Sequence, residues 1–285
     1  MDWTGRVAAI AANRESGASE LSAEVVALLR EAVETATPVE PVARALVRAQ
    51  PSMAPVWNAV RAALTGGGPS GLERYAQHMG RANTALIRYG SALLAADIPA
   101  ERLELVTLSF SGTVAALLEE LGARQPIAVS CADGLPALEG RRLAVRLSAA
   151  GLPITFYSDA ALAQALEGAD AVLVGADAVT PDWFLNKSGT RMLAAAAAQH
   201  GVPVYVCATR DKFLSTAVGT RLTVRDESPD EIWPSPPPLV TVRNRYFERT
   251  PLDLVSAVIS DSGVLGAALM ADACPTQGDD ALLRL

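Results

Sequence analysis

The chain has 285 residues, of which 50% are hydrophobic and 19% charged, with a formal net charge of −7. This composition suits one large domain or two smaller ones and excludes a disordered chain. The acidic balance argues against direct nucleic-acid binding, and no apolar run approaches the roughly 18 residues that span a bilayer. The apolar run at residues 7–12 is shorter than a signal-peptide core, and three cysteines make no disulfide framework. We therefore expect a soluble cytoplasmic protein without a membrane partner.

The first third of the sequence is typical of helices. Apolar residues between Leu21 and Val33 recur at helical spacing, which predicts an amphipathic helix. We expect helices over residues 19–36, 40–49, 54–64 and 71–96. Gly66, Gly68 and Gly71 match the spelling of a dinucleotide-binding motif, but they lie between two helices and follow no strand. This stretch is therefore interpreted as a linker, and no cofactor is expected.

From Leu103 onward, short apolar runs alternate with helical patterns. We expect strands over residues 103–108, 127–130, 153–157, 171–174 and 203–207, and helices over 113–123, 139–150, 159–167 and 188–200. Such alternation predicts an α/β fold with a parallel, doubly wound sheet. A proline-rich loop, an apolar segment at residues 239–242 and closing helices after Pro251 and Gly263 follow. The sequence thus predicts a helical N-terminal domain (residues 1–100) and a Rossmann-like domain (residues 101–285).

Polar residues gather where the expected strands end. They are Ser109, Ser111, Gly112 and Thr113 after the first strand, Asp177 after the fourth, Asn186, Lys187, Gly189 and Thr190 before the following helix, and Lys212 after the fifth strand. In open α/β sheets, ligands bind at the carboxyl ends of the strands, and helix N-termini there suit a phosphate. Any one of these residues could be an ordinary helix cap or a solvated lysine, but their convergence favours a phosphate-ester pocket.

The use of lysine supports this interpretation. Lys187 and Lys212 are the only lysines among 24 Lys and Arg residues, and both fall in the expected pocket. A compact ammonium and a planar guanidinium are not interchangeable at a crowded site. His78 and His200 are far apart and have no ligand-spaced partners, so we expect no metal site.

Several segments together resemble one protein family. They are residues 16–20, 50–58, 139–144, 151–160, 175–177, 186–190, 212–213 and 244–263. The chain resembles the family that joins the alpha, beta and delta subunits of translation initiation factor 2B to methylthioribose-1-phosphate isomerase and ribose-1,5-bisphosphate isomerase. The resemblance implies that Lys187 and Lys212 contact the sugar phosphate and that Asp177 is the catalytic aspartate. It also implies a homodimer or a higher even multimer.

The sequence departs from the family at the catalytic cysteine, whose position is Ser109. Gln50 and Asp133 stand where the family has arginines, and Cys131 stands where it has a glutamate. Two hypotheses therefore stay open. The first is an isomerase of a pentose 1-phosphate, with Asp177 as the acid and Ser109 or Cys131 as the second proton-transfer group, although Cys131 also fits a small buried apolar residue. The second is a non-catalytic regulatory subunit that senses a sugar phosphate or nucleotide.

Overall fold

The computed structural model describes residues 2–13, 18–97 and 102–285. Within the motif at residues 16–20, positions 16 and 17 and the side chains of positions 18 and 19 lie outside the described residues. Five helices open the chain: α1 (Trp3–Ala12), α2 (Ala18–Glu34), α3 (Val39–Ala49), α4 (Ala54–Thr65) and α5 (Pro69–Asp97). The helices expected over residues 19–96 are found, and α1 was not expected.

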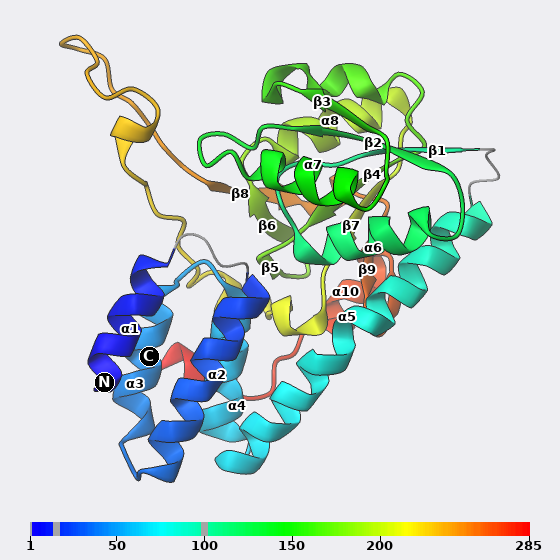
Figure 1. Cartoon of the computed structure of the whole chain (residues 1–285). Helices are drawn as coiled ribbons and strands as arrows, with labels where there is room; N and C mark the ends of the chain where they lie inside the picture. The colour runs from blue at the N-terminus through cyan, green and yellow to red at the C-terminus, as the bar shows by residue number, and fades with distance from the viewer. Residues whose placement is uncertain (1, 14–17, 98–101) are drawn as a thin grey trace.

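The helices α1 to α4 pack around one apolar cluster at the lower left of Figure 1. Val25, Leu29, Leu46 and Val60 are completely buried there. Each helix turns its apolar face toward this cluster, as the spacing of its apolar residues predicts. Burying that stripe stabilises helices that would be marginal in isolation.

The long helix α5 joins this cluster to the rest of the molecule (Figure 1). Leu72 packs in the helical cluster, whereas Leu86 and Leu94 pack against the main sheet. In the C-terminal third of α5, a Cβ atom at Gly90 would lie 2.9 Å from Leu117 Cδ2, so glycine lets α5 pass close to α6 (Gly112–Gly122). The helix therefore contributes to the cores on both sides of the expected domain boundary.

The main sheet has seven strands in the order β10-β9-β7-β4-β1-β2-β3. Their bounds are β1 (Leu103–Val106), β2 (Ile127–Ala132), β3 (Ile154–Tyr157), β4 (Ala171–Gly175), β7 (Val204–Cys207), β9 (Ala257–Ser260) and β10 (Gly263–Leu265). Only the pair β9–β10 is antiparallel. The strand order reverses direction between β1 and β4, which is where open α/β sheets bind their ligands.

Helices cover both faces of this sheet. One face packs against α5, α6 (Gly112–Gly122) and α7 (Glu139–Ala149). The other face packs against α8 (Thr190–His200), α10 (Met270–Ala273) and the 3₁₀ helix η1 (Asp159–Leu166), which replaces the helix expected over residues 159–167. The expected fold class is confirmed: the chain is α/β, with a helical N-terminal part and a mostly parallel sheet.

A second, antiparallel sheet was not expected from the sequence. It contains β5 (Ala178–Val179), β6 (Trp183–Lys187) and β8 (Phe247–Pro251), in the order β5-β6-β8. Along β6, Phe184 packs with the main sheet and Leu185 with the helical cluster, because successive strand residues point to opposite faces. Asn186 and Lys187 thus end a strand, and α8 begins only at Thr190.

The prediction of closing helices is wrong after Pro251 and holds, with short helices, after Gly263. A 3₁₀ turn, η4 (Leu252–Leu254), follows Pro251 and leads into β9 and β10, whereas η5 (Ala267–Leu269), α10 and α11 (Asp279–Leu283) follow β10. The four residues of β9 are all buried beside β7, and such a short apolar run can be told from a helix only by its surroundings. Residues 239–242 form no strand.

The C-terminal segment returns to the helical cluster. Leu282 of α11 (Asp279–Leu283) and Val218 of α9 (Thr216–Gly219) are buried with α1 to α4. The Arg61 guanidinium donates to Asp279 Oδ1 at 2.8 Å, across 218 positions of sequence. The C-terminus lies beside the N-terminal helices in Figure 1, so the first part of the chain obtains its complete core from the last.

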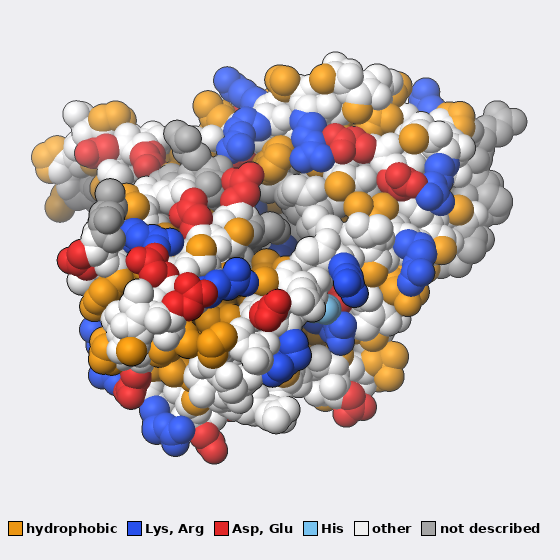
Figure 2. Space-filling view, turned by 60° about the horizontal axis from the view of Figure 1, so that its bottom comes forward, with side chains coloured by type: hydrophobic (Ala, Val, Ile, Leu, Met, Phe, Trp, Pro, Cys, Tyr) orange, Lys and Arg blue, Asp and Glu red, His pale blue; other side chains and the backbone are white. Residues whose placement is uncertain are grey.

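On the face shown in Figure 2, Lys and Arg side chains alternate with Asp and Glu and form no single-sign patch. Within the described ranges, no helix is long and apolar enough to cross a membrane. The segment between α9 and β8, which includes the short η3 (Pro229–Glu231), extends away from the body at the upper left of Figure 1.

Candidate functional site

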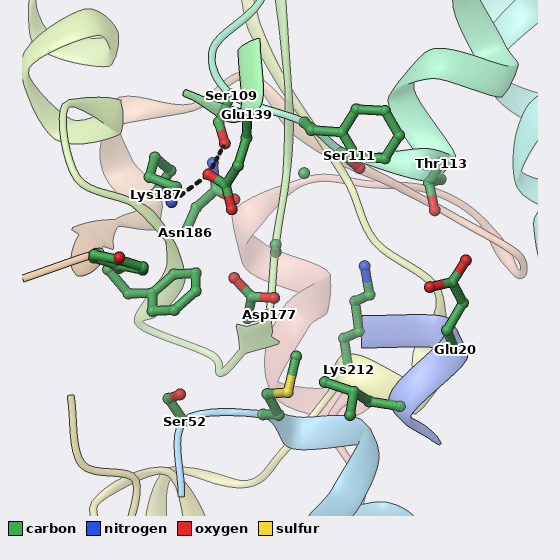
Figure 3. Close-up of a pocket in the computed structure, with 18 of the residues that line it drawn as sticks. Glu20, Ser52, Ser109, Ser111, Thr113, Glu139, Asp177, Asn186, Lys187 and Lys212 are labelled. Atoms are coloured by element: carbon green, nitrogen blue, oxygen red, sulfur yellow. Dashed lines mark hydrogen bonds and ion pairs between the residues drawn. The ribbon is translucent and has the colours of Figure 1, made fainter. Parts of the chain in front are cut away.

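A cavity of about 460 Å³ lies between the helical part and the carboxyl ends of β1 and β4. Figure 3 shows its charged and hydroxyl side chains facing one another across the space. The expected site residues that line it are Ser109, Ser111, Gly112, Thr113, Asp177, Asn186, Lys187 and Lys212. Cys131, Gly189 and Thr190 do not line it. The cavity thus occupies the reversal point of the sheet and contains most of the expected residues.

Cys131 lies on β2 next to β1, as expected, but its thiol points away from the cavity. The residue is completely buried in the core beneath α6 and α7, with Leu143 and Leu147 in the same cluster. Burial raises the pKa of the Cys131 thiol to about 11. A thiol in such surroundings is inert at neutral pH, so its expected place in the pocket is corrected to the core.

The N-terminus of α8 is already occupied by a carboxylate of the chain itself. Glu248 Oε1 accepts hydrogen bonds from the backbone N–H groups of Gly189 (2.7 Å) and Arg191 (2.9 Å). A phosphate expected at this helix end would have to displace that carboxylate. Thr190 instead holds Asn186 in place, because its hydroxyl donates to Lys187 O and accepts from Asn186 Nδ2.

Asp177 follows β4 and has a backbone fixed on two sides. Its N–H donates to Leu185 O (2.8 Å) and its carbonyl accepts from Ala54 N–H (2.9 Å). Burial raises the pKa of its carboxyl to about 6, although the positive charges of Lys212 and Lys187 act in the opposite direction. The negative charge of Glu139 adds to the increase. A carboxyl group in this environment can retain a proton near neutral pH.

The two lysines have different surroundings. Lys187 is 3% exposed, forms an ion pair with Glu139, and lies over the rings of Tyr246 (4.7 Å) and Phe247 (5.3 Å). Lys212 is 5% exposed and ends the 3₁₀ turn η2 (Arg210–Lys212). Its ammonium points into the cavity in Figure 3 and makes no ion pair or hydrogen bond with the described part of the chain. Lys212 is therefore the ammonium available for an anionic ligand.

The turn after β1 brings hydroxyl groups to the cavity. Ser109 has a left-handed backbone (φ 65°), which is uncommon for a residue other than glycine. Ser111 caps α6 by accepting from Val114 N–H. A Cβ atom at Gly175 would lie 2.7 Å from Ser111 Oγ, so glycine at this position lets α6 begin against the end of β4. The free N–H groups of the first turn of α6 thereby reach the cavity.

Gln50 and Asp133, which stand where the family has arginines, bond to other groups of the chain. Gln50 lines the cavity, but its amide donates to Ile10 O at 2.7 Å, and Asp133 pairs with Arg141. Arg146, which also lines the cavity, forms two hydrogen bonds of 2.7 Å with Glu119. These groups leave Lys212 and the α6 N-terminus as the clearest anion-binding elements.

Several lining residues were not expected as site residues. They are Glu20, Ser52, Asn83, Glu139, Arg142, Arg225, Glu227, Tyr246 and Phe247. Glu139 and the Tyr246–Phe247 pair lie inside segments that carry the family resemblance. The helix that begins at Glu139 was expected, but the contacts of these residues also depend on the second sheet, which the sequence pattern did not reveal.

Comparison with known proteins agrees with this architecture. The 5-deoxyribose 1-phosphate isomerase of Moorella thermoacetica is 35% identical over 165 residues, which cover 54% of this chain and 47% of that protein. The methylthioribose-1-phosphate isomerase of Heliobacterium modesticaldum is 34% identical over 170 residues, covering 56% and 49%. The chain thus spans about half the length of these curated relatives.

Among solved structures, the translation initiation factor eIF-2B of Pyrococcus horikoshii OT3 has the same fold. Its TM-score is 0.77 at 24% identity, covering 92% of this chain and 96% of that one. The sequence profile of the Initiation factor 2 subunit family matches residues 11–267, which confirms the resemblance found in the sequence. The chain belongs to the Initiation factor 2 subunit family.

Proposed function

We propose that the chain is an aldose–ketose isomerase that acts on a pentose 1-phosphate. The observation that carries this proposal is the Asp177 carboxyl, whose pKa of about 6 lets it hold a proton in the same cavity as the Lys212 ammonium. Relatives about 35% identical over half of the chain are named isomerases of 5-deoxyribose 1-phosphate and methylthioribose 1-phosphate, which supports the same class.

The chemistry requires an acid and an anion site. A phosphate on the anomeric oxygen keeps the sugar ring closed, so the ring oxygen must be protonated before the ring can open. Asp177 is assigned this proton transfer. The phosphate is assigned to Lys212 and to the first turn of α6, where Ser111, Gly112 and Thr113 line the cavity. The cavity volume lies within the range of about 300–1,000 Å³ that is usual for small-molecule sites.

One observation favours a second function, a non-catalytic subunit that senses a sugar phosphate or nucleotide. Ser109 stands where isomerases of the family have a cysteine, and among the described residues that line the cavity none has a thiol. Such a subunit would use Lys212 and the α6 N-terminus for binding and would leave the ligand unchanged.

Product analysis by NMR separates the two functions. The protein is mixed with ribose 1-phosphate, ribose 1,5-bisphosphate or methylthioribose 1-phosphate, and a new C2 carbonyl signal is expected with at least one of them. Thermal unfolding with each compound measures binding at the same time. Binding without conversion would favour the sensor, and an unchanged Tm with all three compounds would contradict both functions.

We also propose a homodimer or a higher even multimer, in the cytoplasm. Its support is the assembly named for a relative of the same fold, the tetrameric eIF2B-beta2-delta2 complex from C. thermophilum. Light scattering at micromolar concentration is expected to give a mass of at least twice 29.7 kDa. A monomeric mass at that concentration would contradict the proposal.

A further inference from the structure

Among the carboxylates that line the cavity besides Asp177 is that of Glu139, which has neither the acid role nor the phosphate role. Glu139 is the first residue of α7. Its Oε2 atom accepts a hydrogen bond from Ser109 Oγ at 3.0 Å and pairs with the Lys187 ammonium. In the described chain no hydrogen bond or ion pair reaches Oε1, and Figure 3 shows this oxygen facing the cavity on the side of Asp177. One oxygen is therefore anchored and the other is available to a ligand.

The backbone around Glu139 is fixed against the main sheet. The N–H of Gly140 donates to Asp133 O at 2.9 Å. A Cβ atom at Gly140 would lie only 1.6 Å from Ala132 O, so any side chain there would push α7 off the end of β2. Because β2 pairs with β1, this contact holds Glu139 beside Ser109. The carboxylate is thus positioned by rigid elements, as proton transfer to carbon requires.

Asp177 and Glu139, two of the carboxyl groups that line the cavity, have opposite environments. Asp177 is partly buried, and loss of contact with water raises the pKa of its carboxyl to about 6. The charge of Glu139 is compensated by Lys187, which the rings of Tyr246 and Phe247 also hold in place. A pair of titratable groups with such different surroundings can supply one acid and one base to the same reaction.

We propose that Glu139 is the general base that moves the proton between C2 and C1 of the sugar phosphate, while Ser109 and Lys187 position its carboxylate. This inference rests on the proposed isomerase function. It assigns the second proton transfer to a carboxylate on α7, so neither the Ser109 hydroxyl nor the Cys131 thiol has to act as the base.

The proton balance closes without a further reactant. Asp177 protonates the ring oxygen, and the bond between that oxygen and C1 breaks. Glu139 Oε1 removes the C2 proton, and the electrons of that C–H bond form the C1=C2 double bond of an enediol phosphate. Glu139 then returns the proton to C1, while the 2-hydroxyl proton passes to the Asp177 carboxylate and leaves a carbonyl at C2. The phosphate stays on the oxygen of C1.

The test compares Glu139→Gln with wild type in the NMR isomerisation assay. The amide keeps the size of the side chain but cannot take up a proton, so kcat is expected to fall about 10²–10⁴-fold with KM little changed. The acid limb of the pH–rate profile, which reports the base, is expected to disappear, whereas Glu139→Asp retains it. Glu120→Gln, which alters an exposed pair with Arg124 on α6, is the matched control and should behave as wild type.

The outcomes separate this inference from the proposed function. Wild-type kcat in a folded Glu139→Gln variant would overturn the role of Glu139 and leave the isomerase function intact. A larger loss in Ser109→Ala than in Glu139→Gln would also overturn it, since the hydroxyl would then be the base. A wild-type protein that binds but does not convert any pentose 1-phosphate would overturn the isomerase function, and the base with it.

Discussion

Replacing Asp177 by asparagine is expected to lower kcat about 10²–10⁴-fold and to leave the affinity for the sugar phosphate nearly unchanged. The amide has the size of the carboxyl group but has no acidic proton to give to the ring oxygen. In the proposed reaction that proton is needed only in the transition state, while the phosphate site assigned to Lys212 and the first turn of α6 acts in both states. Steady-state kinetics followed by NMR measures kcat, and calorimetric titration measures the affinity for the sugar phosphate.

The same substitution is expected to change stability with a defined pH dependence. Because burial raises the pKa of Asp177 from 3.8 to about 6, the folded protein holds this proton more tightly than the unfolded chain. The unfolding free energy of the wild type therefore falls as the pH rises from about 4 to 6, because the unfolded chain loses this proton first. Above pH 6 the destabilisation has its full size. At about 1.4 kcal/mol per pKa unit, the unfolding free energy of Asp177→Asn relative to wild type should rise by about 2 kcal/mol between pH 4 and pH 7.5. Denaturant unfolding at pH 4 and pH 7.5 tests this, and an equal difference at both would contradict it.

Replacing Lys212 by methionine is expected to weaken sugar-phosphate binding by about 1.5–3 kcal/mol, the usual contribution of a charged hydrogen bond. The apolar side chain keeps most of the volume at a position that is 5% exposed. The Lys187 ammonium, which pairs with Glu139, cannot take over the phosphate without leaving that carboxylate. Calorimetric titration with ribose 1-phosphate measures the loss.

A neighbouring variant controls for general loss of positive charge. Arg210 is in the same 3₁₀ turn, and its half-exposed guanidinium pairs with Asp261 outside the cavity lining. Arg210→Met should therefore bind the phosphate nearly as wild type does. Because Lys212 also compensates the buried carboxyl of Asp211, unfolding curves must show that the Lys212→Met variant is folded. Wild-type affinity in folded Lys212→Met would contradict the assignment of the phosphate site.

The parallel part of the sheet could be predicted from the sequence because its strands are short apolar runs separated by amphipathic helices. β1, β2, β3, β4 and β7 all lie where the pattern placed them. The small sheet could not be predicted in this way. β5 has two residues and β8 contains Glu248 and Arg249, so neither gives an apolar run. β5 pairs locally with β6, but β8 joins the sheet only by pairing with β6 across 60 or more residues.

The residues of the cavity could be predicted better than their contacts. The spacing of Asp177 and Lys212 after buried strands was enough to bring them to one edge of the sheet. The pairing of Lys187 with Glu139 depends on the contact of Gly140 with β2, which no local pattern encodes. The direction of the Cys131 thiol depends on the register of β2, where one position decides between core and cavity. Side-chain pairs formed by tertiary contacts were therefore beyond sequence reasoning.

The return of α11 to the N-terminal helices has a consequence for folding during synthesis. Leu282 is completely buried among helices that leave the ribosome more than 200 residues earlier, and Asp279 pairs with Arg61. Arg61 in turn donates to Asn58, whose amide holds the carbonyls of Asp211 and Phe213 on either side of Lys212. The helices that emerge first therefore expose part of their apolar face until residues 279–283 are made. The chain of contacts from Asp279 through Arg61 and Asn58 to the turn of Lys212 is complete only then.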